Sequence, residues 1–137
     1  MTFSGRNYYE VYLLVLTIGW AIMSWLVGDG EAIASVFPGW GRIVFFGGLI
    51  ASSALALVGI ALGTLVGMLI ERAAMFSLSA LCVCFAIVVG AGADVAQSFY
   101  VVPLLLTYGV VHFHRAHQIR RDINRARAQL RAMGRTR

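Results

Sequence analysis

The chain has 137 residues, of which 60% are hydrophobic and only 12% are charged. Soluble domains carry about 25% charged residues, and a soluble fold of this size cannot hide so much apolar surface from water. Six acidic and eleven basic residues give a net charge of +5, and every basic residue is arginine. These values exclude an ordinary soluble domain and predict one integral membrane domain, because lipid then solvates the apolar surface.

Four uncharged apolar stretches predict four transmembrane helices. The first runs from Val11 to Gly28, the second from Ile43 to Ile70 and the third from Ala73 to Ala93. The fourth begins at Val95, remains apolar to about Val111 and ends near His114. Each is close to or above the ~18–20 residues that cross ~30 Å of hydrocarbon. We therefore expect an all-α bundle of four transmembrane helices over residues 1–114, followed by a basic amphipathic helix over residues 115–137.

The second stretch is long for a single span. Its 28 residues correspond to about 42 Å of helix, which is too long for a perpendicular span and too short for two. We expect one tilted or projecting helix that ends at Glu71-Arg72, so the third span follows at once through a very tight hairpin.

Small residues at intervals of three or four predict a helix-packing face on the second span. Such residues let helix backbones approach closely in a membrane, either within one chain or between subunits. The predicted face consists of Gly48, Ser52, Ala56, Gly59, Gly63 and Gly67. If it lies between subunits, the protein is a homo-oligomer or part of a larger membrane complex.

The third and fourth spans offer few candidate functional groups. Cys82 and Cys84 point in different directions on a helix and are expected to be small apolar residues. Pro103 frees a backbone carbonyl and is expected to kink the fourth span, where Thr107 can hydrogen-bond within the helix. No predicted span contains a charged residue, which argues against ion-coupled transporters and proton relays.

Three histidines stand where the fourth span ends. His114 and His117 share a helix face, whereas His112 lies almost opposite His114. This spacing does not form a one-helix metal site. We expect interfacial polar residues, with metal or haem binding and pH sensing as alternatives.

The arginine-rich tail has one apolar side and one basic side. Its apolar seam has heptad spacing and consists of Ala116, Ile119, Ile123, Ala126, Leu130 and Met133. Its basic side consists of Arg115, Arg120, Arg121, Arg125, Arg127 and Arg131. We expect Ile119, Ile123 and Leu130 to enter an anionic leaflet while the arginines bind headgroups. A self-paired coiled coil and an acidic partner are alternatives, and nucleic acid is a less favoured ligand.

Arginine placement predicts the orientation. With four spans, Arg6, Arg72 and the eight tail arginines share one side, and only Arg42 lies opposite. The positive-inside rule then places both termini in the cytoplasm, with the protein in the inner membrane. Tyr8, Tyr9 and Tyr12 are expected at the inner border, and Trp25 and Trp40 at the outer border. An alternative is a cleaved signal peptide ending at the small residues Ala32 to Ala34.

Motifs of soluble catalysis are absent from the sequence, including HExxH, the phosphate-binding loop, CxxC and GxSxG. We therefore expect no catalytic residue, cofactor or metal.

Two short segments carry a resemblance to known proteins. Glu71-Arg72-Ala73 and the stretch from His114 to Asp122 resemble small membrane proteins of phages and prophages from high-G+C bacteria. The size, the small-residue helices and the basic tail are also similar to holins, which permeabilise the inner membrane. This resemblance implies a self-associating protein that perturbs the membrane. The alternative is a membrane-anchored interaction or immunity protein, or a subunit of a larger membrane complex, that recruits a partner through its tail.

Overall fold

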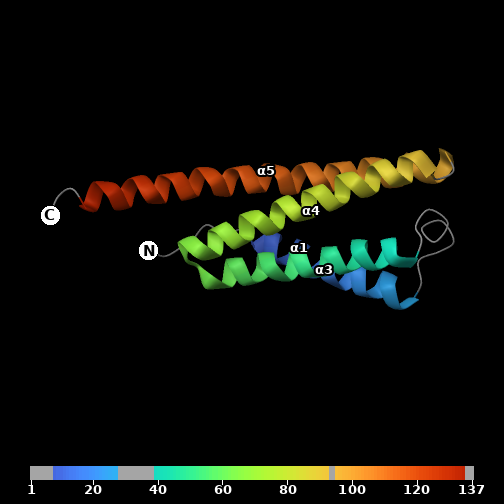
Figure 1. The fold of residues 1–137 in the computed structure, drawn as a ribbon, viewed down its shortest axis with the longest axis horizontal. Coiled ribbons are helices and arrows are strands. Elements are labelled where there is room, and N and C mark those ends of the chain that lie inside the picture. Colours follow the sequence, from blue (N-terminus) through green and yellow to red (C-terminus); the bar gives the residue numbers. More distant parts are fainter. Residues whose placement is uncertain (1–7, 28–38, 93–94, 135–137) are drawn as a thin grey trace.

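The computed structural model describes residues 8–27, 39–92 and 95–134, all of which are helical except a two-residue turn. Within these described residues four helices follow one another: α1 (Tyr8–Val27), α3 (Gly39–Leu62), α4 (Leu65–Gly92) and α5 (Val95–Gly134). Successive helices run in opposite directions along a common long axis (Figure 1). The all-α class and the helix order are therefore as the hydropathy pattern predicts. The small residues Ala32 to Ala34, which the alternative of a cleaved signal peptide would require, lie outside the described residues.

The bundle has two distinct ends. The start of α1, the turn between α3 and α4, and the terminal half of α5 lie at one end, which we call the turn end (Figure 1). The end of α1, the start of α3, the end of α4 and the start of α5 lie at the opposite end. Tyr8 and Tyr9 are exposed at the turn end, and Trp25 and Trp40 are exposed at the opposite end. Aromatic rings thus mark both borders of the apolar surface, as interfacial rings do in membrane proteins.

Gly63 and Thr64 form the turn between α3 and α4. Gly63 has a φ of 59°, a left-handed conformation that glycine adopts without steric cost at a helix C-terminus. Thr64 caps α4, because its side-chain oxygen accepts a hydrogen bond of 3.1 Å from the Gly67 N–H. The predicted hairpin at Glu71-Arg72 is therefore wrong. The apolar run from Ile43 to Ile70 is the end of one helix, a turn and the start of another.

The small residues of α3 pack against α4 of the same chain. A Cβ added at Gly59 would lie 2.7 Å from both the Glu71 nitrogen and the Gly67 oxygen, which are backbone atoms. A Cβ at Gly67 would lie 2.5 Å from the Gly59 oxygen. Further along α3, Ser52 donates a hydrogen bond of 3.0 Å to Ser77 of α4. The two backbones approach this closely only because glycine stands on both sides of the contact.

The remaining members of the predicted face behave differently from one another. Ala56 is fully buried, and a Cβ at Gly48 would lie 2.9 Å from the Leu81 side chain of α4. Gly63, by contrast, has open space around its missing Cβ and serves the turn instead of the packing face. Five of the six predicted positions therefore pack within the chain or are buried in it, and Gly63 needs a different explanation.

The core is formed from all four helices. Phe45 of α3 stacks on Phe85 of α4 with ring centroids 3.7 Å apart. Trp20 of α1 meets the Phe46 ring of α3 edge-on, with ring centroids 5.9 Å apart. Cys82 is buried and Cys84 exposed, so the two thiols do point in different directions.

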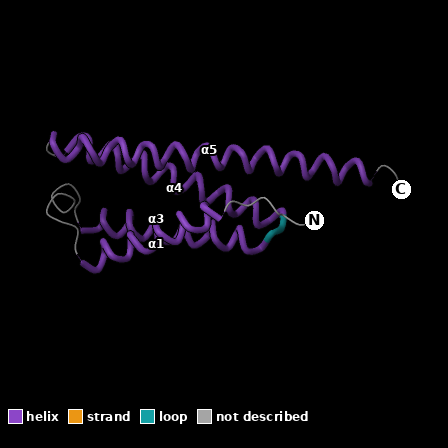
Figure 2. The backbone as a smooth tube through the Cα atoms, turned by 180° about the vertical axis from the view of Figure 1, so that it is seen from behind, coloured by secondary structure: helices purple, strands orange, loops and turns teal. Residues whose placement is uncertain are grey.

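Three described helices are long and apolar enough to cross a membrane: Tyr8–Leu26, Gly39–Leu62 and Leu65–Gly92. Helix α5 is not among them, so its first half as a fourth span remains a prediction. It continues without interruption across Pro103, and Figure 2 shows no sharp bend in it. Thr107 donates a hydrogen bond of 2.7 Å to the Pro103 carbonyl, as predicted for a hydroxyl four residues on.

Candidate functional site

An ion cluster joins three helices near the turn end. Arg115 of α5 forms an ion pair through Nε with Glu10 of α1. Its Nη2 atom lies 3.4 Å from the Glu71 carboxylate of α4. Glu71 has only 1% of its side chain exposed, whereas Arg115 is 23% exposed. One planar guanidinium thus holds two carboxylates on different helices, an arrangement that suits its forked donors.

The cluster corrects two sequence-based expectations. Glu71 and Arg72 lie inside α4, because the turn occurs at Gly63-Thr64. Glu10 lies inside α1, because this helix begins at Tyr8 and not at Val11 as predicted. The expectation that the spanning helices carry no charged residue is therefore wrong. Arg72 stacks its guanidinium over the Phe76 ring, 5.4 Å from the ring centroid, which allows a cation–π contact.

A row of polar side chains continues from the cluster along α5. Arg115, His112 and Tyr108 are separated by three and four residues, so they share one helix face. His112 is buried, and its Nδ1 lies 3.3 Å from the Met75 sulfur of α4. Its ring meets the Tyr108 ring edge-on, with centroids 4.3 Å apart. Among the described residues, the Nε2 atom of His112 has no hydrogen-bond partner.

The structure does not bring the three histidines together. His112 is buried in the bundle, whereas His114 and His117 are exposed on α5. The described part of the chain holds no group of three His, Cys, Asp or Glu side chains placed to bind one metal ion. His112 is buried because α5 packs on α4, which the sequence around it does not specify. The spacing of Tyr108, His112 and Arg115 does predict that the three side chains share one face of the helix.

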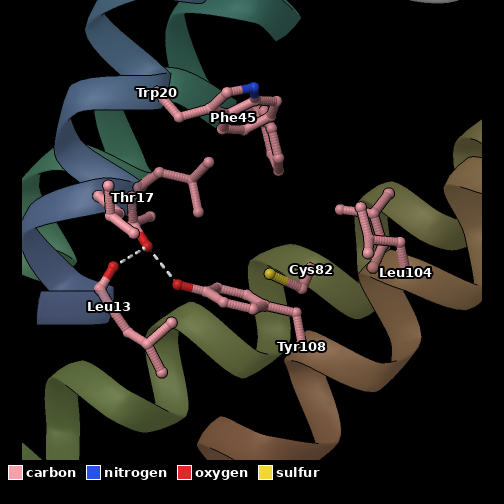
Figure 3. A pocket seen from close by; sticks show the side chains of 10 residues that line it. Leu13, Thr17, Trp20, Phe45, Cys82, Leu104 and Tyr108 are labelled. Atoms are coloured by element: carbon pink, nitrogen blue, oxygen red, sulfur yellow. Dashed lines mark hydrogen bonds between the residues drawn. The ribbon is translucent and has the colours of Figure 1, made fainter. Parts of the chain in front are cut away.

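Tyr108 connects α5 to α1 across a cavity. Its hydroxyl forms a hydrogen bond with the Thr17 hydroxyl, and Thr17 donates a further hydrogen bond of 2.7 Å to the Leu13 carbonyl (Figure 3). The cavity has a volume of about 340 Å³ and is lined mainly by apolar side chains from all four helices. Trp20, Phe45, Cys82 and Leu104 are among them, as Figure 3 shows.

The tail packs on the bundle before it projects beyond it. The Phe76 and Phe113 rings are 5.7 Å apart, and Gly109 approaches Ser79 and Val83 closely, so α4 and α5 are antiparallel neighbours. From this antiparallel register we infer that Ile119 lies beside the first turns of α4 and Ile123 beside the Gly63-Thr64 turn. Both isoleucines are buried, with at most 3% of their surface exposed.

The prediction that Ile119 and Ile123 of the apolar seam enter the lipid is therefore wrong. Ala116, Ile119 and Ile123 belong to the buried core of this structure, so they do not face lipid. Arg120, Arg121, Arg125 and Arg127 are exposed, as predicted for the basic side. The side chains of Leu130, Arg131 and Met133 lie outside the described part of the chain.

These features define the class of protein. Three helices that can cross a membrane, interfacial aromatic rings at both ends and an apolar outer surface identify a small multi-pass helical membrane protein. No family model, curated protein or solved structure matches the chain. Its function is therefore argued from the geometry described above.

Proposed function

We propose that the chain is a non-enzymatic membrane anchor that presents a basic helix to an acidic partner in the aqueous phase. The first half of α5 acts as the fourth span, and the turn end faces the cytoplasm, where the positive-inside rule places arginine-rich segments. Function then depends on association of the tail and not on bond chemistry.

The observation that carries this proposal is the direction of α5. The helix runs along the bundle axis and continues past the turn end (Figures 1 and 2). From Ile123 to Gly134 it extends about 16 Å beyond the turn, at ~1.5 Å per residue. A tail that continues the bundle axis points away from the bilayer, whereas a lipid-bound amphipathic helix lies in the plane of the interface.

The two halves of the tail then have different surroundings. Arg120 and Arg121 lie beside the bundle and are within reach of lipid headgroups. Arg125 and Arg127 lie beyond the turn, where a soluble acidic surface is the available counter-charge. Arg125 has 77% of its side chain exposed and contacts Asp122 at 3.6 Å, a surface pair that contributes little. The proposal therefore assigns partner binding to the far half.

A direct test uses the full chain in nanodiscs of neutral lipid. Soluble polyglutamate should bind, and added salt should weaken binding, because exposed charges are screened within ~10 Å at 0.1 M salt. The double variant Arg125→Gln and Arg127→Gln should lose most of this binding. The matched variant Arg120→Gln and Arg121→Gln should retain more of it but bind anionic vesicles less. Equal losses in both variants would contradict the division of the tail.

The holin-like hypothesis requires a small-residue face that is free to meet a second copy. In this structure that face packs α3 on α4, so a different face would have to associate. Its test is separate: inducing the chain alone should abruptly collapse the membrane potential. Sustained growth at high expression would favour the anchoring proposal.

A further inference from the structure

The cavity between α1 and α5 is open toward the outer surface of the bundle. Leu16, Trp20 and Leu104 line it, and each has about half or more of its surface exposed. Its floor is formed by Phe45 and Cys82, which are buried. Ligand pockets are typically concave, mostly apolar and of 300 Å³ or more, with a few polar groups that orient the ligand. The cavity fits this description and opens where hydrocarbon surrounds the helices.

The hydroxyl groups of Thr17 and Tyr108 at the cavity both use their hydrogens in hydrogen bonds within the protein. Thr17 donates its only hydroxyl hydrogen to the Leu13 carbonyl. In the Thr17–Tyr108 hydrogen bond the donor is therefore Tyr108, and its only hydroxyl hydrogen is also used. Both oxygens keep lone pairs that can accept. The lining offers the indole N–H of Trp20 and the weak thiol of Cys82 as donors, whereas the Thr17 and Tyr108 oxygens can only accept a hydrogen bond from a ligand.

In the part of the chain that the structure describes, the first arginine after Tyr108 along α5 already has ionic partners. Arg115 lies seven residues from Tyr108, about 10 Å along α5. Its guanidinium contacts Glu10 and Glu71 and donates to Gln118. Among the described residues, an anionic head group would therefore find no free positive charge at this cavity, and a buried carboxylate without such a charge is strongly disfavoured.

We propose that this cavity binds a long-chain alcohol. Its hydrocarbon chain occupies the apolar cavity, and its hydroxyl donates a hydrogen bond to the Tyr108 oxygen. A plain alkane lacks the donor, and a fatty acid carboxylate has no hydrogen to donate to Tyr108 and would be buried without a positive charge beside it. The site is thus selective for an uncharged chain with a hydroxyl group, and this proposal does not depend on the role of the tail.

Trp20 provides a built-in reporter for the test. The exposed Trp25 and Trp40 are changed to phenylalanine, which leaves Trp20 as the single indole in the chain. The protein in phosphatidylcholine nanodiscs is then titrated with dibrominated dodecanol, dibrominated dodecane or dibrominated dodecanoic acid. Bromine quenches a nearby indole, so the Trp20 signal reports occupancy. The alcohol should quench at about fivefold lower mole fraction than the alkane, the effect of one net hydrogen bond.

Three variants locate the effect. Tyr108→Phe should abolish the difference between alcohol and alkane while retaining quenching by both. Leu105→Phe should fill the cavity and weaken quenching by both probes, whereas Val110→Phe, on the exposed face of α5, should change neither. Equal quenching by alcohol and alkane in the parent protein would overturn the proposal, as would an alcohol preference that survives in Tyr108→Phe. The comparison of the three probes in the parent protein requires no variant in the cavity to fold.

Discussion

Gly59 offers the sharpest test of how α3 and α4 pack. In Gly59→Ala the new Cβ would lie 2.7 Å from the Glu71 nitrogen and the Gly67 oxygen, and 3.0 Å from the Glu71 Cα. All three are backbone atoms, so no side chain can rotate away. Ordinary contact begins near 3.4 Å, and the helices must therefore separate by several tenths of an ångström along the whole interface.

The expected cost follows from that separation. Overpacking typically costs about 1–3 kcal/mol, and close interhelical contacts in membranes contribute about 1–2 kcal/mol in model peptides. Replacing glycine by alanine within a helix returns about 0.5–1 kcal/mol. We expect a net loss of about 1–2 kcal/mol for Gly59→Ala. Gly59→Leu should cost more than ~3 kcal/mol, because a larger side chain has no space at this contact.

Thermal unfolding in a mild detergent, followed by circular dichroism, measures this loss. Gly19→Ala is the matched control, because Gly19 lies within α1 and a Cβ there meets nothing within 4 Å. It should be neutral or slightly stabilising. If Gly59→Ala unfolds at the same temperature as Gly19→Ala, the close backbone contact between α3 and α4 does not exist and the reasoning fails.

The other predictions concern the turn, the ion cluster, the tail and the topology. Gly63→Ala should lose about 1–2 kcal/mol through its left-handed backbone and not through packing, so Gly63→Asn, which tolerates that conformation, should recover part of the loss in the same melts. Arg115→Ala should cost about 2–4 kcal/mol, because it removes a cation from the buried Glu71 carboxylate, and Glu71→Gln in the Arg115→Ala background should recover part of the stability; additive losses in this double variant would refute the ion cluster. Ile119→Ala should cost about 2–4 kcal/mol as a core truncation, with Ala128→Ser on the exposed side as the control; an unchanged melting temperature would return Ile119 to the lipid-facing role. Reporter fusions at residues 1 and 137 should report the same compartment, and opposite compartments would refute a four-span topology.

The boundary between α3 and α4 is a helix end that the hydropathy pattern alone does not locate. The run from Ile43 to Ile70 contains no charge, so a scan for apolar residues reads it as one helix. The local signal was nevertheless present, because glycine followed by threonine suits a helix end followed by a helix cap. Misplacing this turn by eight residues put Glu71 and Arg72 in a loop. The capping residues Gly63 and Thr64 predict a helix start at residue 65, which places Glu71 and Arg72 inside α4.

The candidate site was harder to predict for a different reason. Glu10, Glu71 and Arg115 are far apart in the sequence, and nothing local to any of them specifies the others. The same holds for Thr17 and Tyr108, which meet only because α1 and α5 flank one cavity. The shared helix face of Tyr108, His112 and Arg115 could be read from spacing, but its partners on α1 and α4 could not.

The sequence by itself determined the all-α class and the multi-pass membrane character of this protein. Those properties follow from composition and from the number of apolar runs, since lipid accepts only structures that satisfy their own backbone hydrogen bonds. Tertiary structure decided which faces meet. It turned the small-residue face of α3 inward against α4, and it buried Ile119 and Ile123 on the bundle. Both outcomes depend on the position of the turn and on the register between neighbouring helices, which arise from contacts between residues distant in the sequence and not from any local pattern.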